Sequence, residues 1–171
     1  MTGKLMTTVE GLDPIIDYNA KVLILGSMPS VESVRKGEYY ANQRNQFWKI
    51  LFSVFGSELA PSYPAKVSFL KGRRIALWDV IKQCDREGSS DSKITNMRIN
   101  DFTSMLVTYP KIKYLCFNGQ KAYKIFQQQI GLETHHNLTT KMLPSTSPAN
   151  AGKPIEVKTV EWTLIKTLLS D

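Results

Sequence analysis

The residues best suited to chemistry lie between positions 26 and 48, where short polar side chains alternate with aromatic ones. The hydroxyls of Ser27 and Ser30, with the backbone N–H groups around them, can face a polar ligand at close range. The neighbouring rings of Tyr39 and Tyr40 add a flat apolar surface. A flat ring beside polar donors suits a nucleobase, so this segment is predicted to bind one.

A second polar segment lies at 143–151 and reads Leu-Pro-Ser-Thr-Ser-Pro-Ala-Asn-Ala. Its two prolines stiffen the backbone, and its serines and Thr146 can donate hydrogen bonds to phosphate oxygens. The same composition is also typical of a turn-rich loop that binds nothing. This segment alone therefore leaves both interpretations open.

Four short apolar runs are predicted to be buried parallel strands, because each is followed by Gly, Pro, Ser or Asp: residues 22–25, 75–78, 114–117 and 142–143. Helix-period segments lie between them at 47–55, from a cap at Asn100 to about Tyr109, and at 121–129. A last helix is predicted to open near Pro154, with Trp162 toward the edge of an apolar stripe formed by Val157, Val160, Leu164, Ile165 and Leu168.

Strands that alternate with helices imply right-handed crossovers. We therefore expect a three-layer α/β/α sandwich around a four-stranded, mostly parallel sheet, as one domain over residues 1–171. Such a sheet delivers the loops at 26–45, 79–93, 118–120 and 144–153 to one edge. Open parallel sheets bind their ligands at that edge.

Charge and composition narrow the possible partners. The 22 Lys and Arg against 15 Asp and Glu give a net charge of +7, which favours a polyanion, and the positive charge is scattered rather than gathered in a tail. No apolar run approaches the ~20 residues that span a bilayer, and the first residues lack the apolar core of a signal peptide. We expect a cytoplasmic protein with no membrane partner.

No metal or cofactor is expected. Cys84 and Cys116 are too few to hold an iron–sulfur cluster, and the adjacent His135 and His136 lack companions at zinc-ligand spacing. The sequence contains neither Gly-x-Gly-x-x-Gly nor Gly-Lys-Ser/Thr, which argues against a dehydrogenase or a P-loop enzyme.

Taken together, the two polar segments resemble the uracil-DNA glycosylase superfamily. Residues 40–48, Tyr-Ala-Asn-Gln-Arg-Asn-Gln-Phe-Trp, are similar to the Phe-Ala-His-Pro-x-Asn-Arg-Phe-Trp run of its mismatch-specific branch. The Gly-Ser-x-Pro-Ser start, the Tyr-Tyr pair, Asn-x-Phe-Trp and Ser-Thr-Ser-Pro-Ala-Asn-Ala resemble the hypoxanthine-DNA (deoxyinosine) glycosylase branch more closely. The resemblance extends from about Asp13 to the final helix.

Two departures from the other branches locate the expected chemistry. Met28 occupies the place where mismatch-specific enzymes carry the asparagine that positions water, and a thioether cannot orient water. Ala149 occupies the place of the leucine that wedges into the duplex. The resemblance therefore implies Asn45, of Asn-x-Phe-Trp, as the catalytic residue and argues against ordinary uracil excision.

The resemblance also implies that Tyr40 stacks on a flipped base. For Asn45 we expect the side-chain carbonyl to align water and the NH₂ group to donate to the base or sugar. Two structural alternatives remain. In the first, the tyrosines only pack on the helix at 47–55, and in the second, Asn45 is the N-cap of that helix.

Further site residues are expected from their places at the strand ends. The backbone at Gly26 and Ser27 is expected to donate to a base carbonyl, and Asp79 either accepts from the base or polarises water, unless it only caps its loop. Met28 and Asn118 are expected to border the base. Contacts to DNA are predicted for Ser30, Ser145, Ser147, Pro148, Ala149 and Asn150.

These expectations describe a monofunctional DNA glycosylase that hydrolyses the N-glycosidic bond of a flipped deaminated base in base excision repair, with hypoxanthine as the expected base. Its partner is DNA containing that base, and we expect a monomer without cofactors. The alternatives are a uracil or mismatch-specific glycosylase, and a catalytically inactive nucleic-acid-binding module of the same fold.

Overall fold

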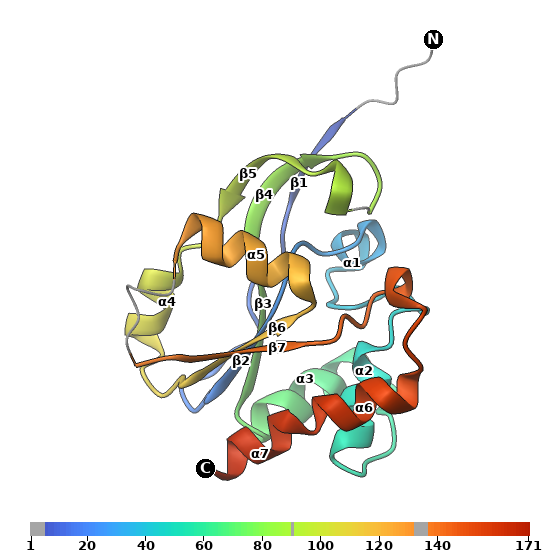
Figure 1. Ribbon diagram of the computed structural model, residues 1–171, viewed down its shortest axis with the longest axis vertical. Helices are drawn as coiled ribbons and strands as arrows, with labels where there is room; N and C mark the ends of the chain where they lie inside the picture. Colours follow the sequence, from blue (N-terminus) through green and yellow to red (C-terminus); the bar gives the residue numbers. More distant parts are fainter. Residues whose placement is uncertain (1–5, 90, 132–136) are drawn as a thin grey trace.

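A computed structural model describes residues 6–89, 91–131 and 137–171, and a four-stranded parallel sheet lies at its centre (Figure 1). The strands run in the order β3-β2-β6-β7, all pairs parallel, and comprise β2 (Val22–Gly26), β3 (Ile75–Asp79), β6 (Tyr114–Asn118) and β7 (Thr139–Leu143). Each predicted strand is therefore confirmed. Three of them extend one residue further, to a polar residue or glycine at the sheet edge, and β7 begins three residues earlier.

Helices cover both faces of this sheet. In β2, Val22 and Ile24 pack toward α2 (Phe47–Val54), α3 (Tyr63–Gly72), α6 (Ile155–Trp162) and α7 (Leu164–Ser170). Leu23 and Leu25 pack toward α4 (Phe102–Thr108) and α5 (Gln120–Gln129) on the other face. Alternate strand residues point to opposite faces, so both faces need apolar side chains. The three-layer prediction is confirmed.

A second, three-stranded antiparallel sheet was not predicted. It contains β1 (Thr7–Glu10), β4 (Ile81–Arg86) and β5 (Thr95–Ile99) in the order β1-β4-β5, with the short helix η1 (Asp91–Lys93) between β4 and β5. The prediction of a loop over 79–93 was therefore wrong. β1 and β5 are largely polar and exposed, and β4 buries only alternate or scattered residues, so none of the three carries a continuous apolar run by which the sequence would reveal it.

Two further helices were not predicted. The first, α1 (Val31–Lys36), lies inside the 26–45 segment, where the Ser30 hydroxyl accepts the Ser33 N–H at 3.1 Å. Gly37 ends this helix with φ 66°, a conformation that favours glycine. The second is α3, which begins after the N-cap Ser62. Both are short or weakly amphipathic, so the periodicity of their sequences is poor.

Two predicted helix details were wrong. Asp101, not Asn100, caps α4 by accepting the Ser104 N–H at 3.0 Å, while Asn100 donates to the backbone oxygen of Asp79 at 2.7 Å. The C-terminal helix is broken in two at Thr163, and its predicted stripe is reversed within α6: Trp162 is fully buried, whereas Val160 is 70% exposed. Residues two apart on a helix lie on nearly opposite faces, so burying the indole turns Val160 outward.

The carboxyl ends of the central strands meet the features that shape the functional site. There α1 lies beside the short helix η2 (Pro148–Asn150), which belongs to the second polar segment (Figure 1). No helix within the described ranges is both long and apolar enough to cross a membrane. His135 and His136 lie outside the described residues.

Candidate functional site

A cavity of about 460 Å³, which we call the sheet-edge cavity, opens between the two polar segments at the carboxyl ends of β2, β3 and β6. It brings together nearly all residues predicted for the site: Gly26, Ser27, Met28, Ser30, Tyr40, Asn45, Asp79, Asn118, Ser145, Ser147, Pro148 and Ala149. Asn150 is the exception. The volume is in the range of ordinary small-ligand sites and can take one nucleobase with its sugar.

Thr146 joins the two segments at the wall of this cavity. Its backbone N–H donates to Asn118 Oδ1 at 3.0 Å, which identifies the other end of the Asn118 amide as the NH₂ group. That group donates to Thr146 Oγ1 at 2.9 Å, so the Thr146 hydroxyl proton is directed to Asn45 Oδ1 at 2.8 Å. Thr146 is completely buried. From the sequence, Thr146 was expected only to donate a hydrogen bond to a phosphate.

The orientation of the Asn45 amide follows from the same contacts. Asn45 Oδ1 also accepts the backbone N–H of Phe47, at 3.0 Å, and a backbone N–H can only donate, so the atom it meets is the amide oxygen. Both lone pairs of that oxygen are used. The Asn45 NH₂ has no hydrogen-bond partner within the described part of the chain, and Asn45 lines the cavity.

These contacts refine two expectations for Asn45. The N-cap of α2 is Gln46, so the capping alternative placed the cap one residue too early. Asn45 still stabilises the start of the helix, because its Oδ1 accepts the Phe47 N–H. The expectation that its carbonyl aligns water does not fit this geometry, because that oxygen already accepts two hydrogen bonds. What Asn45 offers to a ligand is its pair of N–H donors.

Tyr40 is held with one face against the protein. Its ring stacks on Phe47 with centroids 4.0 Å apart, and its hydroxyl accepts from Asn118 Nδ2 at 3.2 Å. Its backbone has φ 55°, which is unusual for a residue with a side chain. Burial, together with the negative charge of Asp79, raises the pKa of Tyr40, so its phenol is neutral. Only the second ring face is available to a base.

Tyr39 has a structural role. Its hydroxyl donates to the backbone oxygen of Asp13 at 2.9 Å, and its own carbonyl accepts from Trp48 Nε1 at 2.9 Å. The side chain is buried, and burial raises the pKa of its phenol. The packing alternative is thus correct for Tyr39, although the residue also contributes to the cavity wall.

Gly26 and Asp79 face one another across the β2–β3 pair at the cavity floor. A Cβ atom at Gly26 would lie 2.5 Å from Asp79 Oδ1 and 3.2 Å from the Tyr40 hydroxyl oxygen. The absence of a side chain at Gly26 is therefore what lets this carboxylate and phenol approach the strand end. Asp79 is buried and is the one carboxylate among the described residues that line the cavity.

The second polar segment is held together by its own side chains. Ser145 Oγ accepts the Ser147 N–H at 3.2 Å, and Ser147 Oγ accepts the Ala149 N–H at 3.2 Å. Asn150 Nδ2 donates to the backbone oxygen of Ser145 at 3.1 Å, so its amide supports the loop from outside the cavity. The predicted contact of Asn150 with DNA stays a prediction, and Ala149 is exposed at the rim.

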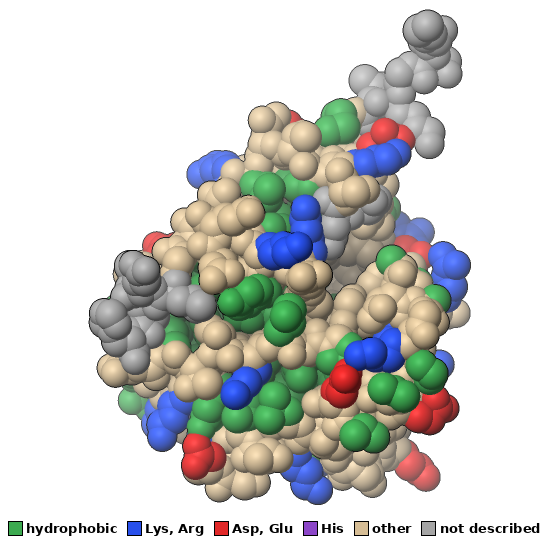
Figure 2. Space-filling model, viewed as in Figure 1, with side chains coloured by type: hydrophobic (Ala, Val, Ile, Leu, Met, Phe, Trp, Pro, Cys, Tyr) green, Lys and Arg blue, Asp and Glu red, His purple; other side chains and the backbone are tan. Residues whose placement is uncertain are grey.

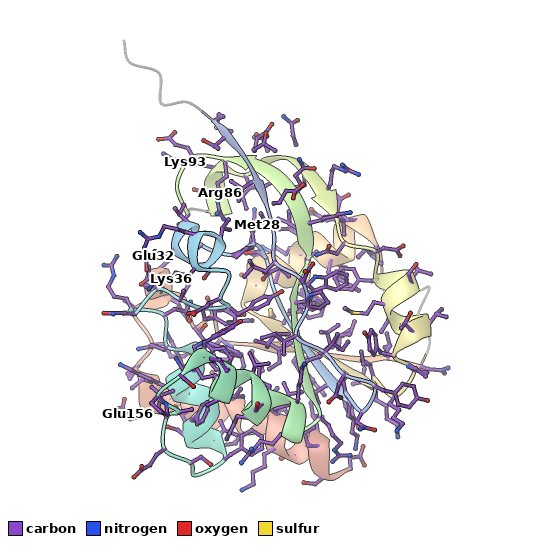
Figure 3. The ribbon with its side chains drawn as sticks, turned by 180° about the vertical axis from the view of Figure 1, so that it is seen from behind. Met28, Glu32, Lys36, Arg86, Lys93 and Glu156 are labelled. Atoms are coloured by element: carbon purple, nitrogen blue, oxygen red, sulfur yellow. The ribbon has the colours of Figure 1, made fainter. Side chains whose placement is uncertain are left out.

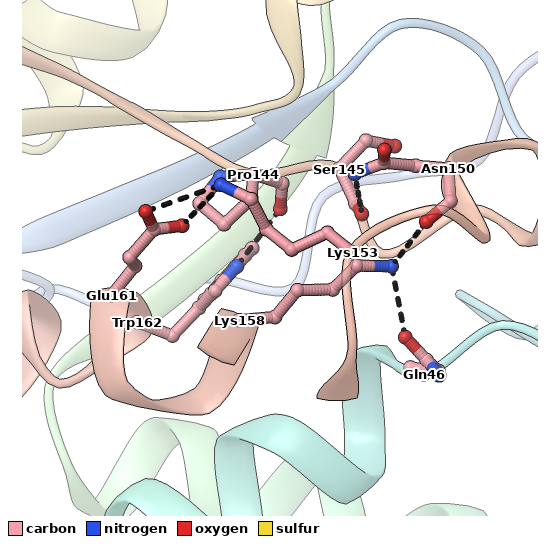
Figure 4. Close-up of polar contacts among 8 residues, drawn as sticks. All are labelled: Gln46, Pro144, Ser145, Asn150, Lys153, Lys158, Glu161 and Trp162. Carbon is pink, nitrogen blue, oxygen red and sulfur yellow. Dashed lines mark hydrogen bonds and ion pairs between the residues drawn. The ribbon is translucent and has the colours of Figure 1, made fainter. Parts of the chain in front are cut away.

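A buried lysine that was not expected from the sequence connects the two polar segments by hydrogen bonds. Lys158 Nζ donates to Gln46 Oε1 at 3.0 Å and to the backbone oxygen of Asn150 at 2.8 Å (Figure 4). Next to this contact, the Gln46 N–H donates to the backbone oxygen of Thr146 at 3.0 Å. Lys158 lies four residues before Trp162, hence on the same buried helix face. That spacing was the available signal.

Burial lowers the pKa of Lys158, and the positive charge of Lys153 adds to the effect. The ammonium form is therefore less favoured in the folded chain than in the unfolded chain, where the lysine pKa is about 10.4. Raising the pH toward that value should increase the free energy of unfolding of the wild type relative to Lys158→Met, because the neutral amine keeps its hydrogen bonds. Urea unfolding of both proteins at pH 8 and pH 10 measures this difference. A difference in the free energy of unfolding between the two proteins that stays the same at both pH values would contradict this prediction.

Arg86 of β4 holds the first polar segment in place through a hydrogen bond to its backbone. Its guanidinium is buried and donates from Nη2 to the backbone oxygen of Pro29 at 2.7 Å. In Figure 3, Arg86 and Met28 lie beside α1. The Nε and Nη1 atoms have no hydrogen-bond partner among the described residues. Because β4 itself was not predicted, nothing in the sequence placed Arg86 here.

The surface charge agrees with the expected scatter. Figure 2 shows lysine and arginine side chains distributed singly over the visible face rather than gathered in one patch. Among the residues that the structure describes, no cluster of three or more His, Cys, Asp or Glu side chains could hold a metal ion. Both cysteines are buried thiols, and burial raises the pKa of Cys116 to about 12.

Comparison with known proteins identifies the family. The model of the uracil DNA glycosylase superfamily matches residues 14–163, which is most of the chain. The chain belongs to the uracil-DNA glycosylase superfamily. The resemblance inferred from the two polar segments is thereby confirmed, and the sheet-edge cavity lies between the two segments that carried it.

Individual members of the superfamily agree in sequence and in structure. Proteins named hypoxanthine DNA glycosylase from Methanosarcina acetivorans and Methanosarcina barkeri are 45% and 40% identical to this chain, over 143 and 144 residues. Each alignment covers 82% of this chain and 87% of the relative. A solution NMR structure from Methanosarcina acetivorans, solved as a candidate uracil DNA glycosylase, superposes with a TM-score of 0.75 at 37% identity and covers 94% of this chain and 99% of its own.

Proposed function

We propose that this protein is a monofunctional DNA glycosylase that acts as a monomer and removes hypoxanthine from DNA. It flips deoxyinosine into the sheet-edge cavity and hydrolyses the N-glycosidic bond, leaving an abasic site for base excision repair. The names and identities of the relatives support the choice of base. The observation that carries the chemistry is the Asn45 amide, whose oxygen is fixed by Thr146 and Phe47 and whose NH₂ is left for the substrate.

Base flipping is favoured by the shape of the cavity. Extruding a base costs a few kcal/mol, and stacking on an aromatic ring returns about 1–3 kcal/mol. The free face of Tyr40 provides that ring, and the stack on Phe47 prevents the ring from turning away. The basic net charge adds attraction to the phosphate backbone.

Bond cleavage separates charge inside the cavity. The electron pair of the C1′–N9 bond leaves with the purine, the sugar becomes oxocarbenium-like, and the oxygen of water bonds to C1′ as its proton is released. Donors aimed at the departing base lower the barrier because they need not reorganise during the reaction. The Asn45 NH₂ fits this role, since its orientation is set before the substrate arrives.

Asp79 is the acidic group of the site. Hypoxanthine carries a hydrogen at N1 that a carboxylate can accept, and the buried carboxylate of Asp79 lies at the cavity floor. The same carboxylate could instead polarise the attacking water. An Asp79→Asn variant separates these roles when tested on deoxyinosine and on a deoxynucleotide whose base lacks the N1 hydrogen, because only loss of water activation slows both reactions.

The proposed function is tested by single-turnover incubation with oligonucleotides that contain deoxyinosine, deoxyuridine or deoxyxanthosine. Alkali then reveals abasic sites. We expect cleavage at deoxyinosine to be fastest by at least about tenfold, the discrimination available from one or two polar contacts. Cleavage at deoxyuridine alone would identify a uracil enzyme. Salt-sensitive DNA binding without abasic product at any lesion would identify an inactive module.

Gly26→Ala is expected to impair excision while the protein remains folded. The added methyl group must displace the Asp79 carboxylate or the Tyr40 hydroxyl, since both lie within contact distance of it. A displacement of about 1 Å at a reacting site can cost on the order of 100-fold in rate. Single-turnover excision of deoxyinosine measures the loss, with Gly72→Ala as the control because a Cβ atom there meets nothing. Equal loss in both variants would contradict this account.

A further inference from the structure

A second cavity, of about 480 Å³, lies on the other side of the segment that carries Tyr40 and Asn45. We call it the lysine cavity. It shares Tyr39, Tyr40, Asn42 and Asn45 with the sheet-edge cavity, so these residues form a partition between the two. The roles proposed above for the flipped base use only the sheet-edge side of this partition. The lysine cavity therefore has no function in the mechanism so far.

The lysine cavity is positively charged. Lys36 at the end of α1, Lys49 in α2 and Lys66 in α3 line it, together with one carboxylate, Glu38. In the view of Figure 3, Lys36 lies on the side of α1 that is nearer to α3. None of the three lysines forms an ion pair with a described residue. Three lysines drawn from separate elements thus line one space, with one carboxylate among the described residues beside them.

The remaining walls are aromatic and polar. Lys66 Nζ lies 5.6 Å from the centre of the Trp48 ring, a cation–π distance that keeps its stem against the wall. Tyr63 also lines the cavity, and its hydroxyl oxygen accepts the Tyr39 N–H at 3.0 Å. This combination of cationic and aromatic groups is typical of grooves that hold single nucleotides of a DNA strand.

From this arrangement, and resting on the proposed glycosylase function, we infer that the lysine cavity binds a backbone phosphate of the damaged strand next to the flipped nucleotide. The damaged strand continues on both the 5′ and the 3′ side of the nucleotide whose base occupies the sheet-edge cavity, so its flanking phosphates lie near the partition. The phosphate that reaches the lysine side meets Lys36 and Lys49, and its charge is balanced there. Binding of this phosphate would hold the strand in its flipped form.

The test neutralises one phosphate at a time. Duplexes contain 2′-fluoro-deoxyinosine, whose glycosidic bond resists hydrolysis, and carry a single uncharged methylphosphonate at one of the two nearest positions on either side. Affinity is measured by fluorescence anisotropy for the wild type and for the Lys36→Gln/Lys49→Gln double variant. Lys166→Gln is the matched control, because Lys166 is exposed and lines neither cavity.

We expect one methylphosphonate position to weaken wild-type binding by about tenfold at low salt, as for the loss of one charge-assisted contact. The double variant should bind the unmodified duplex about tenfold more weakly and be insensitive to that same position. Equal sensitivity of the double variant and the wild type at every position would overturn the inference. So would competition by inorganic phosphate without any methylphosphonate effect, which would indicate a site for a free anion.

This outcome is separable from that of the proposed function. The binding cycle uses an uncleaved duplex, whereas excision is read as abasic product from ordinary deoxyinosine. Absence of product with an intact binding cycle would refute the glycosylase activity and leave the phosphate site standing. Product formation without any coupling between the lysines and a phosphate would refute the phosphate site alone.

Discussion

Asn45→Asp is expected to fold like the wild type and to lose about 10²–10³-fold in the single-turnover rate of hypoxanthine excision, the usual cost of removing one preorganised donor. An aspartate keeps an oxygen for the Phe47 N–H and for the Thr146 hydroxyl, so both contacts that the asparagine oxygen makes are preserved. What it lacks is the NH₂ group. The fall in excision rate therefore measures the contribution of the N–H donors and not that of the contact with α2.

Asn45→Ala provides the comparison. It removes the oxygen as well, so it should lose activity to a similar extent and also lower the free energy of unfolding by about 1 kcal/mol. Thermal or urea unfolding of both variants separates the two effects. Full activity in Asn45→Asp would show that an oxygen at this position, and not an N–H donor, is what the reaction requires, and would restore the water-aligning role.

Thr146→Val is expected to have the second largest effect, about 10- to 100-fold in the excision rate, because a misplaced catalytic group loses much of its effect. Valine matches the shape of threonine but cannot accept from Asn118 or donate to Asn45. The Asn45 oxygen is then held by the Phe47 N–H alone, and the amide can rotate. An unpaired Asn118 donor also destabilises the fold by about 1–3 kcal/mol.

Thr146→Ser is the control for stability. It keeps the hydroxyl and loses only a methyl group, so it should recover most of the rate even if it folds less stably than the wild type. Single-turnover excision of deoxyinosine at saturating enzyme measures each rate. Equal activity of the valine and serine variants, both well folded, would exclude a role for the hydroxyl.

The parts of this fold that the sequence predicted are those whose pattern is local. Strands buried on both faces need continuous apolar runs, and β2, β3 and β6 have them, ending at Gly26, Asp79 and Asn118. Because parallel strands end at the same edge, the residues after these runs were bound to meet. Most of the predicted site therefore lines one cavity.

The parts that were missed depend on contacts that are distant in sequence. Thr146 acts on Asn45 across 101 residues, and Arg86 on Pro29 across 57. Nothing in the local sequence of Thr146 distinguishes it from the serines beside it. β5 is polar because it lies at the surface, and β4 mixes polar residues with the buried Ile81, Cys84 and Arg86, so neither strand carries a continuous apolar run.

The break in the C-terminal helix was also missed, because the buried face of α6 is decided by contacts with distant residues and not by local periodicity. The periodicity of 157–168 fits one apolar stripe. In the structure, however, Trp162 is buried and Val157 and Val160 are exposed, because burying the large indole removes more apolar surface from water than burying the two valines. The indole packs edge to face with Phe47 at 5.8 Å and donates to the backbone oxygen of Pro144 at 2.9 Å. That choice of face is also what turns Lys158 inward, beneath the second polar segment.

A double-mutant cycle between Asn45 and Thr146, measured as the single-turnover rate of hypoxanthine excision, tests directly whether Thr146 orients a catalytic Asn45 amide. If Thr146 acts by orienting the Asn45 amide, Thr146→Val should slow the wild type by about 10- to 100-fold and have almost no effect on Asn45→Ala. The same slowing in both backgrounds would contradict the account, since Thr146 would then act on excision without Asn45.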